Sequence, residues 1–178
     1  MKLYKKNLNK LIQGKVYNPN QEHDACGVGF VASTDGIKSR RVVEFGIDAL
    51  KAVWHRGAVD ADGKTGDGAG IHIEIPKDFF IERIQNAGRL HKEGTICIGM
   101  IFLPRNDYPS QEKCKTIIEN ELLNKNYYVY RWRQVPVNTK VLGLKAESNR
   151  PEIVQVIFKS NNLKLEGDDL ERDLFVIR

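Results

Sequence analysis

The sequence predicts a single layered domain of the α/β or α+β class. The first observation is that hydrophobic periods of two residues and of about 3.6 residues alternate along the chain. The second is length, because 178 residues suffice for one domain with its own core, and domains usually contain about 100–200 residues. The third is composition, since 41% hydrophobic and 29% charged residues are ordinary for a globular protein. In domains where strands and helices alternate along the chain, the helices pack against the sheet.

Residues 1–25 predict a polar leader that precedes the folded domain. The segment is rich in Lys and Asn, lacks a sustained hydrophobic period and contains a turn-like Asn-Pro-Asn at 18–20. It carries a net charge of +3, most of the +5 of the whole chain. No basic stripe interleaved with aromatic residues follows it, so the charge does not indicate a nucleic-acid partner.

No segment indicates export or insertion into a membrane. The longest apolar run of the leader is Leu11-Ile12, which is too short for the core of a secretory signal. Nor does any stretch approach the roughly 20 apolar residues that cross a bilayer. The three cysteines, Cys26, Cys97 and Cys114, are odd in number and form no CxxC pair, which argues against a disulfide framework and a zinc site. We therefore expect a cytoplasmic protein without a bound metal.

The first half of the folded part predicts a strand, a helix and a second strand. Residues 26–32 indicate a buried strand that contains two glycines. Residues 58–70 predict a loop rich in Gly and Asp, and residues 71–75 alternate Ile with polar side chains, as a half-buried strand does. Between the two strands, apolar residues spaced four, three and four apart mark one helical face, which ends at the basic residues and glycine of 55–57: Val43, Ile47, Leu50 and Trp54.

The next three elements are predicted to be a helix, a strand and a helix. Residues 76–78 open a helix that runs through Ile84. Residues 95–103 are almost continuously apolar, which indicates a central strand. Ser110 is a good N-cap for a helix whose apolar stripe includes Cys114.

Two strands and a last helix complete the predicted order. Residues 127–133 and 152–159 have the composition of strands. Asp168-Asp169 begins a helix whose apolar pattern continues to Ile177, without a helix-ending signal before the end of the chain. We take this unfinished pattern as an indication that the chain is part of a longer polypeptide.

Three short segments resemble ligand-binding motifs in residue spacing but lack the flanking elements or key residues that those motifs require. Residues 27–32 fit the glycine spacing of a dinucleotide-binding turn, yet no strand precedes them and no helix directly follows. A phosphate loop ending at Lys64 would need its first glycine at position 58, which is Ala58. Asp60 and Asp62 open like a calcium loop that then lacks its next ligand and its glycine. We reject all three.

Cys26 remains as the candidate for chemistry. A lone cysteine in a strand is most often a small buried hydrophobic residue. Cys26, however, stands at the junction of the leader and the first predicted strand, and cleavage between Ala25 and Cys26 would place a free α-amine on the cysteine itself. Such an amine has a pKa of about 7.7–8.0 and can act as a general base near neutral pH. Nucleophile and base would then belong to one residue, and no histidine would be needed.

Several ungapped stretches support this interpretation by their resemblance to a known family. Residues 25–30, 54–58, 61–70 and 131–138 are similar to segments of the class II, N-terminal-nucleophile glutamine amidotransferases, and within that family to the amidotransferase domain of the glutamate synthase large chain. The resemblance covers the whole chain, the leader included. It implies an α+β fold, an αββα sandwich of two mainly antiparallel sheets that is incomplete in this chain. Residues 1–25 would be a propeptide, and residues 26–178 the N-terminal part of the amidotransferase domain.

The resemblance also implies a reaction and a set of partners. Glutamine would be hydrolysed through a thioester, and the ammonia would pass to synthase domains of the same polypeptide, where 2-oxoglutarate becomes glutamate. The full-length enzyme would carry FMN and an iron–sulfur cluster, while this segment would need no cofactor. Electrons would come from a small NADPH-oxidising subunit or from ferredoxin, and the sequence leaves both open.

Functional residues follow from the resemblance one position at a time. Cys26 matches the nucleophile, and Arg56 matches an arginine that orders the active site around it. Arg56 has an alternative role as a charge answering the C-terminal dipole of its helix, an effect of about 0.3–1 kcal/mol. Residues 65–70 match a segment that lines the approach to the site, although a simple turn into the next strand explains them equally well. Cys97 and Cys114 are expected to be core thiols.

The sequence departs from the family in one respect. The family stabilises its oxyanion with an Asn-Gly pair, and no Asn-Gly dipeptide occurs in these 178 residues. We expect the oxyanion and glutamine-binding residues downstream of Arg178, and little or no glutaminase activity from this chain alone. Two alternatives remain: another class II amidotransferase, such as one that supplies ammonia to sugar phosphates or asparagine, and a non-catalytic binding module that retains the fold.

Overall fold

The computed structural model describes residues 2–14, 27–53, 59–66 and 68–178. They belong to two compact units, Met1–Arg56 and Gly57–Arg178, which are treated separately below. None of the helices within these ranges is long and apolar enough to cross a membrane.

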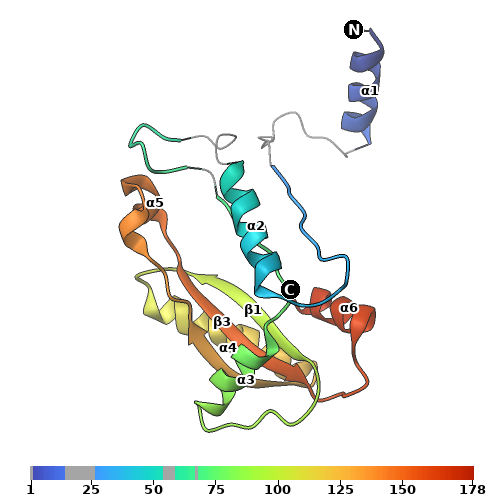
Figure 1. The fold of residues 1–178 in the computed structure, drawn as a ribbon, viewed down its shortest axis with the longest axis vertical. Helices are drawn as coiled ribbons and strands as arrows, with labels where there is room; N and C mark the ends of the chain where they lie inside the picture. The colour runs from blue at the N-terminus through green and yellow to red at the C-terminus, as the bar shows by residue number, and fades with distance from the viewer. Residues whose placement is uncertain (1, 15–26, 54–58, 67) are drawn as a thin grey trace. The chain divides into compact units, whose positions relative to one another are not determined.

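The described part of the first unit contains two helices, α1 (Lys2–Gln13) and α2 (Arg40–Ala52) (Figure 1). The predicted leader was expected to lack regular structure, and α1 corrects that expectation. Positions 4, 8 and 11 are apolar and spaced four and three apart, a helical period that the intervening Lys and Asn residues obscure. The helix predicted from Val43, Ile47 and Leu50 is confirmed by α2, in which these side chains are half-buried. The helix ends at Ala52, before the end predicted at residues 55–57, and Trp54 lies outside the described residues.

Two segments predicted to be strands form none. Residues 27–32 are not paired with any described residue, and Val28 and Phe30 are 93% and 90% exposed. Residues 71–75 likewise belong to no strand of the described structure, and Ile71 is exposed. A strand is stabilised by hydrogen bonds to a neighbouring strand, and an apolar period of two residues indicates which side chains would be buried without supplying that neighbour.

The second unit is built on a three-stranded sheet in the order β1-β3-β2. The strands β1 (Ile96–Leu103), β2 (Tyr127–Gln134) and β3 (Glu152–Ser160) confirm the three remaining strand predictions. Because β3 runs antiparallel to both neighbours, β1 and β2 run parallel to each other. Parallel strands need a long crossover connection, and α4 (Tyr108–Asn124) supplies it.

The sequence prediction placed the wrong strand at the centre. In the part of the sheet that the structure describes, β1 is an edge strand and β3 lies in the middle. Five consecutive residues of β3, from Val154 to Phe158, are buried. On β1, by contrast, Met100 and Phe102 are 50% and 64% exposed. Uniform apolarity therefore did not distinguish a covered strand from one with a partly open face.

Helices cover both faces of the sheet and create two apolar cores (Figure 1). On one face, Leu122 of α4 and Leu170 of α6 (Gly167–Ile177) pack with strand residues that include Cys97. On the other face, Phe80 and Ile84 of α3 (Lys77–Gln85) do the same, which confirms the helix predicted after Pro76. Layers of helix on an antiparallel sheet confirm the α+β class.

Two helix starts differ from the sequence prediction. The N-cap of α4 is Asp107 rather than Ser110: its carboxylate accepts hydrogen bonds from the Ser110 amide at 3.1 Å and from the Ser110 hydroxyl at 2.6 Å. Aspartate is as good an N-cap as serine, so local preference did not separate them. The N-cap position of the last helix is Glu166, two residues before the predicted Asp168, and its side chain makes no capping hydrogen bond. The short η2 (Thr139–Val141) and α5 (Leu144–Asn149) were not predicted.

Candidate functional site

The residues assigned to catalysis from the sequence, Cys26, its neighbour Ala25, and Arg56, lie outside the described residues. The structure does describe most of the Gly- and Asp-rich segment that follows Arg56 in the chain. This segment belongs to the second unit, and its first part, residues 59–66, is held in place by contacts that can be traced atom by atom.

Residues 59–66 form a tight hairpin. Val59 and Gly66 make an isolated antiparallel bridge, and the Asp60 amide donates to the carbonyl of Thr65 at 2.7 Å. The turn closes where the Gly63 amide donates to the carbonyl of Asp60 at 2.9 Å. Gly63 has a φ of +68°, in the left-handed region that favours glycine. The segment expected to be an open loop is therefore a defined element.

Asp62 organises the tip of this hairpin. One carboxylate oxygen accepts from the amides of Lys64 and Thr65 at 2.9 and 2.7 Å, and the other accepts from the Thr65 hydroxyl at 2.6 Å. These hydrogen bonds, above all the one from the Thr65 hydroxyl, hold the pKa of Asp62 far below its ordinary value. The carboxylate is ionised, and its two oxygens accept hydrogen bonds from two backbone amides and one hydroxyl of the hairpin.

The hairpin rests on the start of α5. The Ala146 amide donates to the hydroxyl of Thr65 at 3.3 Å, and the Lys145 ammonium is 2.5 Å from a carboxylate oxygen of Asp60. The ammonium lowers the pKa of Asp60, chiefly through its hydrogen bond, and the pKa of Lys145 is raised in return. Gly143, the N-cap of α5, lies directly against the side chains of Asp62 and Thr65.

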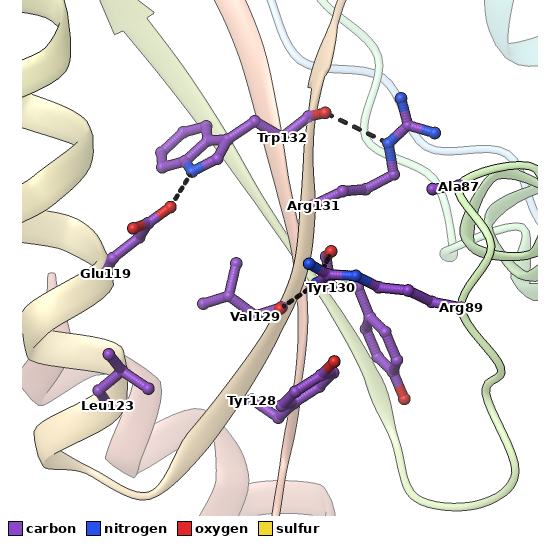
Figure 2. A pocket seen from close by; sticks show the side chains of 9 residues that line it. All are labelled: Ala87, Arg89, Glu119, Leu123, Tyr128, Val129, Tyr130, Arg131 and Trp132. Carbon is purple, nitrogen blue, oxygen red and sulfur yellow. Dashed lines mark hydrogen bonds between the residues drawn. The ribbon is translucent and has the colours of Figure 1, made fainter.

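An open groove of about 560 Å³ runs along the free edge of β2, beside α4 (Figure 2). Its polar groups already bond to the protein: the Trp132 indole donates to Glu119 at 2.6 Å, and Arg89 donates to the carbonyls of Val129, at 2.9 Å, and Tyr130. The guanidinium thus satisfies two carbonyls beside the irregularity in β2, where the register shifts between Val129 and Arg131. No cysteine or histidine lines this groove, and we assign it no chemistry.

The two described thiols, Cys97 and Cys114, differ in burial. Cys97 is buried in the core between the sheet and α4, and burial raises the pKa of its thiol to about 12. Cys114 is half-buried on α4, less than the core position expected for it. His72 is exposed, in a segment that forms no strand among the described residues. Among the described residues, no three His, Cys, Asp or Glu side chains gather as metal ligands would.

Comparison with known proteins identifies the family. The sequence profile of class II glutamine amidotransferases matches residues 26–178. This chain belongs to that family. The match covers well over half of the chain and agrees with the α+β class of the second unit.

The curated relatives of this amidotransferase chain are glutamate synthases. It is 50% identical over 175 residues to the glutamate synthase [NADPH] large chain of Azospirillum brasilense, covering 98% of this chain and 12% of the relative. The chain is 39% identical over 159 residues to the ferredoxin-dependent glutamate synthase of Pyropia yezoensis, an alignment that covers 89% of this chain and 10% of the relative. The chain is also 39% identical over 145 residues to the glutamate synthase [NADH] of Saccharomyces cerevisiae. That alignment covers 79% of this chain and 7% of the relative. The chain thus spans only about a tenth of the length of these relatives.

The residues of α5 that contact the hairpin were not predicted from the sequence. Gly143 and Lys145 carry no motif, and α5 was not predicted, because six residues are too few to show a helical period. Their contacts join segments about eighty positions apart in the chain.

Proposed function

We propose that this chain is the glutaminase segment of a glutamate synthase, with Cys26 as its nucleophile. The observation that carries the proposal is a family match that begins at residue 26, the position already singled out by its place after the leader. Removal of residues 1–25 frees the α-amine of Cys26, which is the general base. The 50% identity to a glutamate synthase large chain over nearly the whole segment supports the choice within the family.

The proposed reaction uses one thiol and one amine. The α-amine takes the proton of the Cys26 thiol, and the thiolate attacks the side-chain amide carbon of glutamine. The carbon–nitrogen bond breaks as the amine returns the proton to the leaving nitrogen, so ammonia departs and a thioester remains. Water, deprotonated by the same amine, hydrolyses the thioester to glutamate and restores the thiol. Arg56 orders this site, and residues 65–70 line the approach of glutamine.

Ammonia then passes to the synthase part of the longer polypeptide. There it condenses with 2-oxoglutarate, and a pair of electrons reduces the product to a second glutamate, with FMN and an iron–sulfur cluster implied as carriers. The higher identity to an enzyme named for NADPH than to one named for ferredoxin, 50% against 39%, favours NADPH as the electron source. We place the enzyme in the cytoplasm, since the leader lacks the features of a secretory signal.

The proposal is tested on the full-length protein. Intact mass and N-terminal sequencing are compared before and after treatment with 6-diazo-5-oxo-L-norleucine, a reactive glutamine analogue. We expect a mature chain that begins at Cys26 and carries one covalent label there. The Cys26→Ala variant should lose the label and glutamine-dependent ammonia release, while Cys114→Ala should retain both. A mature protein that still begins at Met1, or a label on another residue, contradicts the assignment.

The same experiment separates the alternatives. A non-catalytic module predicts an uncut leader and no label anywhere in the protein. Another class II amidotransferase predicts the label at Cys26 but a different fate for the ammonia. Glutamate formation from 2-oxoglutarate and glutamine, followed with NADPH or reduced ferredoxin, distinguishes that alternative from a glutamate synthase and identifies the donor.

A further inference from the structure

The free edge of β2 has the features of a strand that could pair with another strand. In the part of the sheet that the structure describes, β2 pairs with β3 along one edge, and its other edge faces the open groove (Figure 2). Most residues of β2 are aromatic or β-branched, the types with high β propensity. The backbone groups of such an edge are a template for pairing with another chain unless something covers them.

Arg89 covers this edge at its middle. Its Nη1 atom, which carries two hydrogens, donates to the carbonyl of Val129 at 2.9 Å and to that of Tyr130 (Figure 2). The guanidinium carbon also lies 5.9 Å from the centroid of the Tyr128 ring, within the range of a cation–π contact. An added strand would need these carbonyls as acceptors for its own amides. While Arg89 occupies them, no strand can pair there.

The irregularity in β2 makes this double hydrogen bond possible. In a regular strand, consecutive carbonyls point toward opposite neighbours, so one nitrogen does not reach both. The register of β2 against β3 shifts between Val129 and Arg131, and Tyr130 has no partner on β3. Such an extra residue is left out of the ladder. Its carbonyl is therefore available beside that of Val129, where a single guanidinium nitrogen serves both.

The end of α3 fixes the position of Arg89. The Gly88 amide donates to the carbonyl of Gln85 at 2.8 Å, and the Arg89 amide donates to that of Ile84 at 3.2 Å. This pair of hydrogen bonds is the Schellman arrangement, which ends a helix with a residue in the left-handed region. Gly88 has a φ of +71°, a value that favours glycine. Because Ile84 packs in the same apolar core as Tyr130, this turn holds the Arg89 backbone beside β2.

We propose that Arg89 is a cap on the free edge of β2, which prevents this edge from pairing with β2 of a second copy of the protein. Without the cap, two β2 strands can pair antiparallel about a twofold axis, because each edge offers the other the same free amides and carbonyls. This role concerns self-association and is independent of the proposed glutaminase chemistry.

The test measures hydrogen exchange of the β2 amides in the full-length protein at a low and a high protein concentration. Arg89→Ala removes the cap. Arg105→Ala is the matched control: it also removes a guanidinium that donates to a backbone carbonyl, that of Glu147 at 3.0 Å, but Arg105 follows β1 and does not line the edge of β2. We expect exchange of β2 in Arg89→Ala to slow as the concentration rises, together with a faster-sedimenting species. The wild type and Arg105→Ala should show neither change.

The direction of the change separates edge pairing from a simple loss of stability. Destabilisation speeds exchange at every concentration, whereas pairing of two edges slows exchange only as the copies associate. If β2 of Arg89→Ala exchanges faster at both concentrations, or exchanges as in the wild type, Arg89 only supports its own turn and the inference is wrong.

A second pair of variants keeps the inference testable if Arg89→Ala does not fold. Gly88→Ala retains the Arg89 side chain but strains the turn that positions it. Gly63→Ala is its control, because Gly63 also has a positive φ, +68°, and a Cβ at either glycine meets no described atom within 4 Å. The two substitutions impose similar backbone strain, and only Gly88→Ala acts on the cap. We expect the concentration-dependent slowing of β2 exchange in Gly88→Ala alone; identical behaviour of the two variants would overturn the inference.

Discussion

Cys97 illustrates how burial removes a thiol from chemistry. Its side chain is 4% exposed and packs in the core with Leu122 and Phe158. Desolvation, helped by the negative charge of Glu171, raises the pKa of the thiol from 9.0 to about 12. The thiolate is the reactive form of cysteine, so Cys97 is inert near neutral pH. The sequence predicted this position correctly, because a cysteine inside a continuous apolar run is surrounded by apolar side chains in any sheet.

We expect iodoacetamide to modify Cys97 far more slowly than Cys114 in the native full-length protein at about pH 8. A rise of the pKa from 9.0 to about 12 lowers the thiolate fraction at that pH by about 10³. Pulsed alkylation followed by peptide mapping measures both residues in one sample. Similar rates for the two thiols would show that the core opens readily.

The same pKa shift makes the stability of the core sensitive to alkali. The fold favours the protonated thiol, so its contribution is complete below pH 9.0, the ordinary pKa, and is lost as the pH rises toward 12. Tyr127, whose pKa burial also raises, adds to the effect. Hydrogen exchange of the β1 amides is compared between the wild type and Cys97→Val. Because both proteins contain Tyr127, any difference in their pH dependence comes from the thiol. The wild type should lose protection faster than the variant above about pH 9.

Single residues of the candidate site were harder to predict than core residues. Asp60, Asp62 and Thr65 were recognised as part of a motif, but their roles were not, because the spelling suggested a cation loop or a simple turn. Their hydrogen bonds show a locked hairpin instead. Gly143 was missed altogether, since the atoms that exclude a side chain there belong to another part of the chain.

Helix α4 is stabilised by a buried glutamine as well as by its apolar stripe. Gln111 is 7% exposed, and its amide nitrogen donates to the carbonyls of Pro104, at 2.6 Å, and Arg105, at 3.2 Å. These carbonyls belong to the turn between β1 and α4. The glutamine therefore ties the beginning of the helix to the end of the strand.

Gln111→Leu should destabilise the start of α4 by about 1–3 kcal/mol, because it leaves two carbonyls without their donor. Lys113→Leu is the control: it introduces the same side chain two positions away, at an exposed site on the same helix. Hydrogen exchange of the α4 amides in the full-length protein reports the local opening free energy of each variant. An equal effect of the two substitutions would mean that the hydrogen bonds of Gln111 contribute nothing.

Strands and helices differed in how well they were predicted. The helices α2, α3, α4 and α6 form where apolar residues repeat at helical spacing, since their hydrogen bonds lie within the segment. The hydrogen bonds of a strand are made to a partner strand, which lies elsewhere in the chain. In the part of the chain that the structure describes, residues 27–32 and 71–75 therefore form no strand despite a suitable pattern. The most apolar strand, β1, lies at an edge of the sheet.

The molecule as a whole leaves large apolar side chains in contact with water. Val28, Phe30, Met100 and Phe102 are each at least half exposed. Monomeric proteins rarely expose contiguous apolar patches unless the patch binds something. Met100 and Phe102, two positions apart on β1, lie on the same face of the strand.

We expect the chain of residues 1–178, expressed alone, to bind the dye ANS and to show little or no glutaminase activity. Loss of even one oxyanion donor typically costs about 10²–10³ in rate. Dye fluorescence and ammonia release, each compared with the full-length enzyme at equal concentration, provide the measurements. The double variant Met100→Ser, Phe102→Ser should reduce the fluorescence if the open face of β1 binds the dye. A dye-silent segment that hydrolyses glutamine at the full-length rate contradicts this expectation.

Local pattern and motif spelling were enough to predict the α+β class, four of the helices, the three paired strands and the family, because each depends on residues that are near one another in the chain. The folded structure adds the strand order β1-β3-β2, the absence of a described strand at residues 27–32 and 71–75, and the contact of the hairpin with Gly143. These properties arise from hydrogen-bond partners and steric contacts between distant segments. No period or spacing within one segment contains that information.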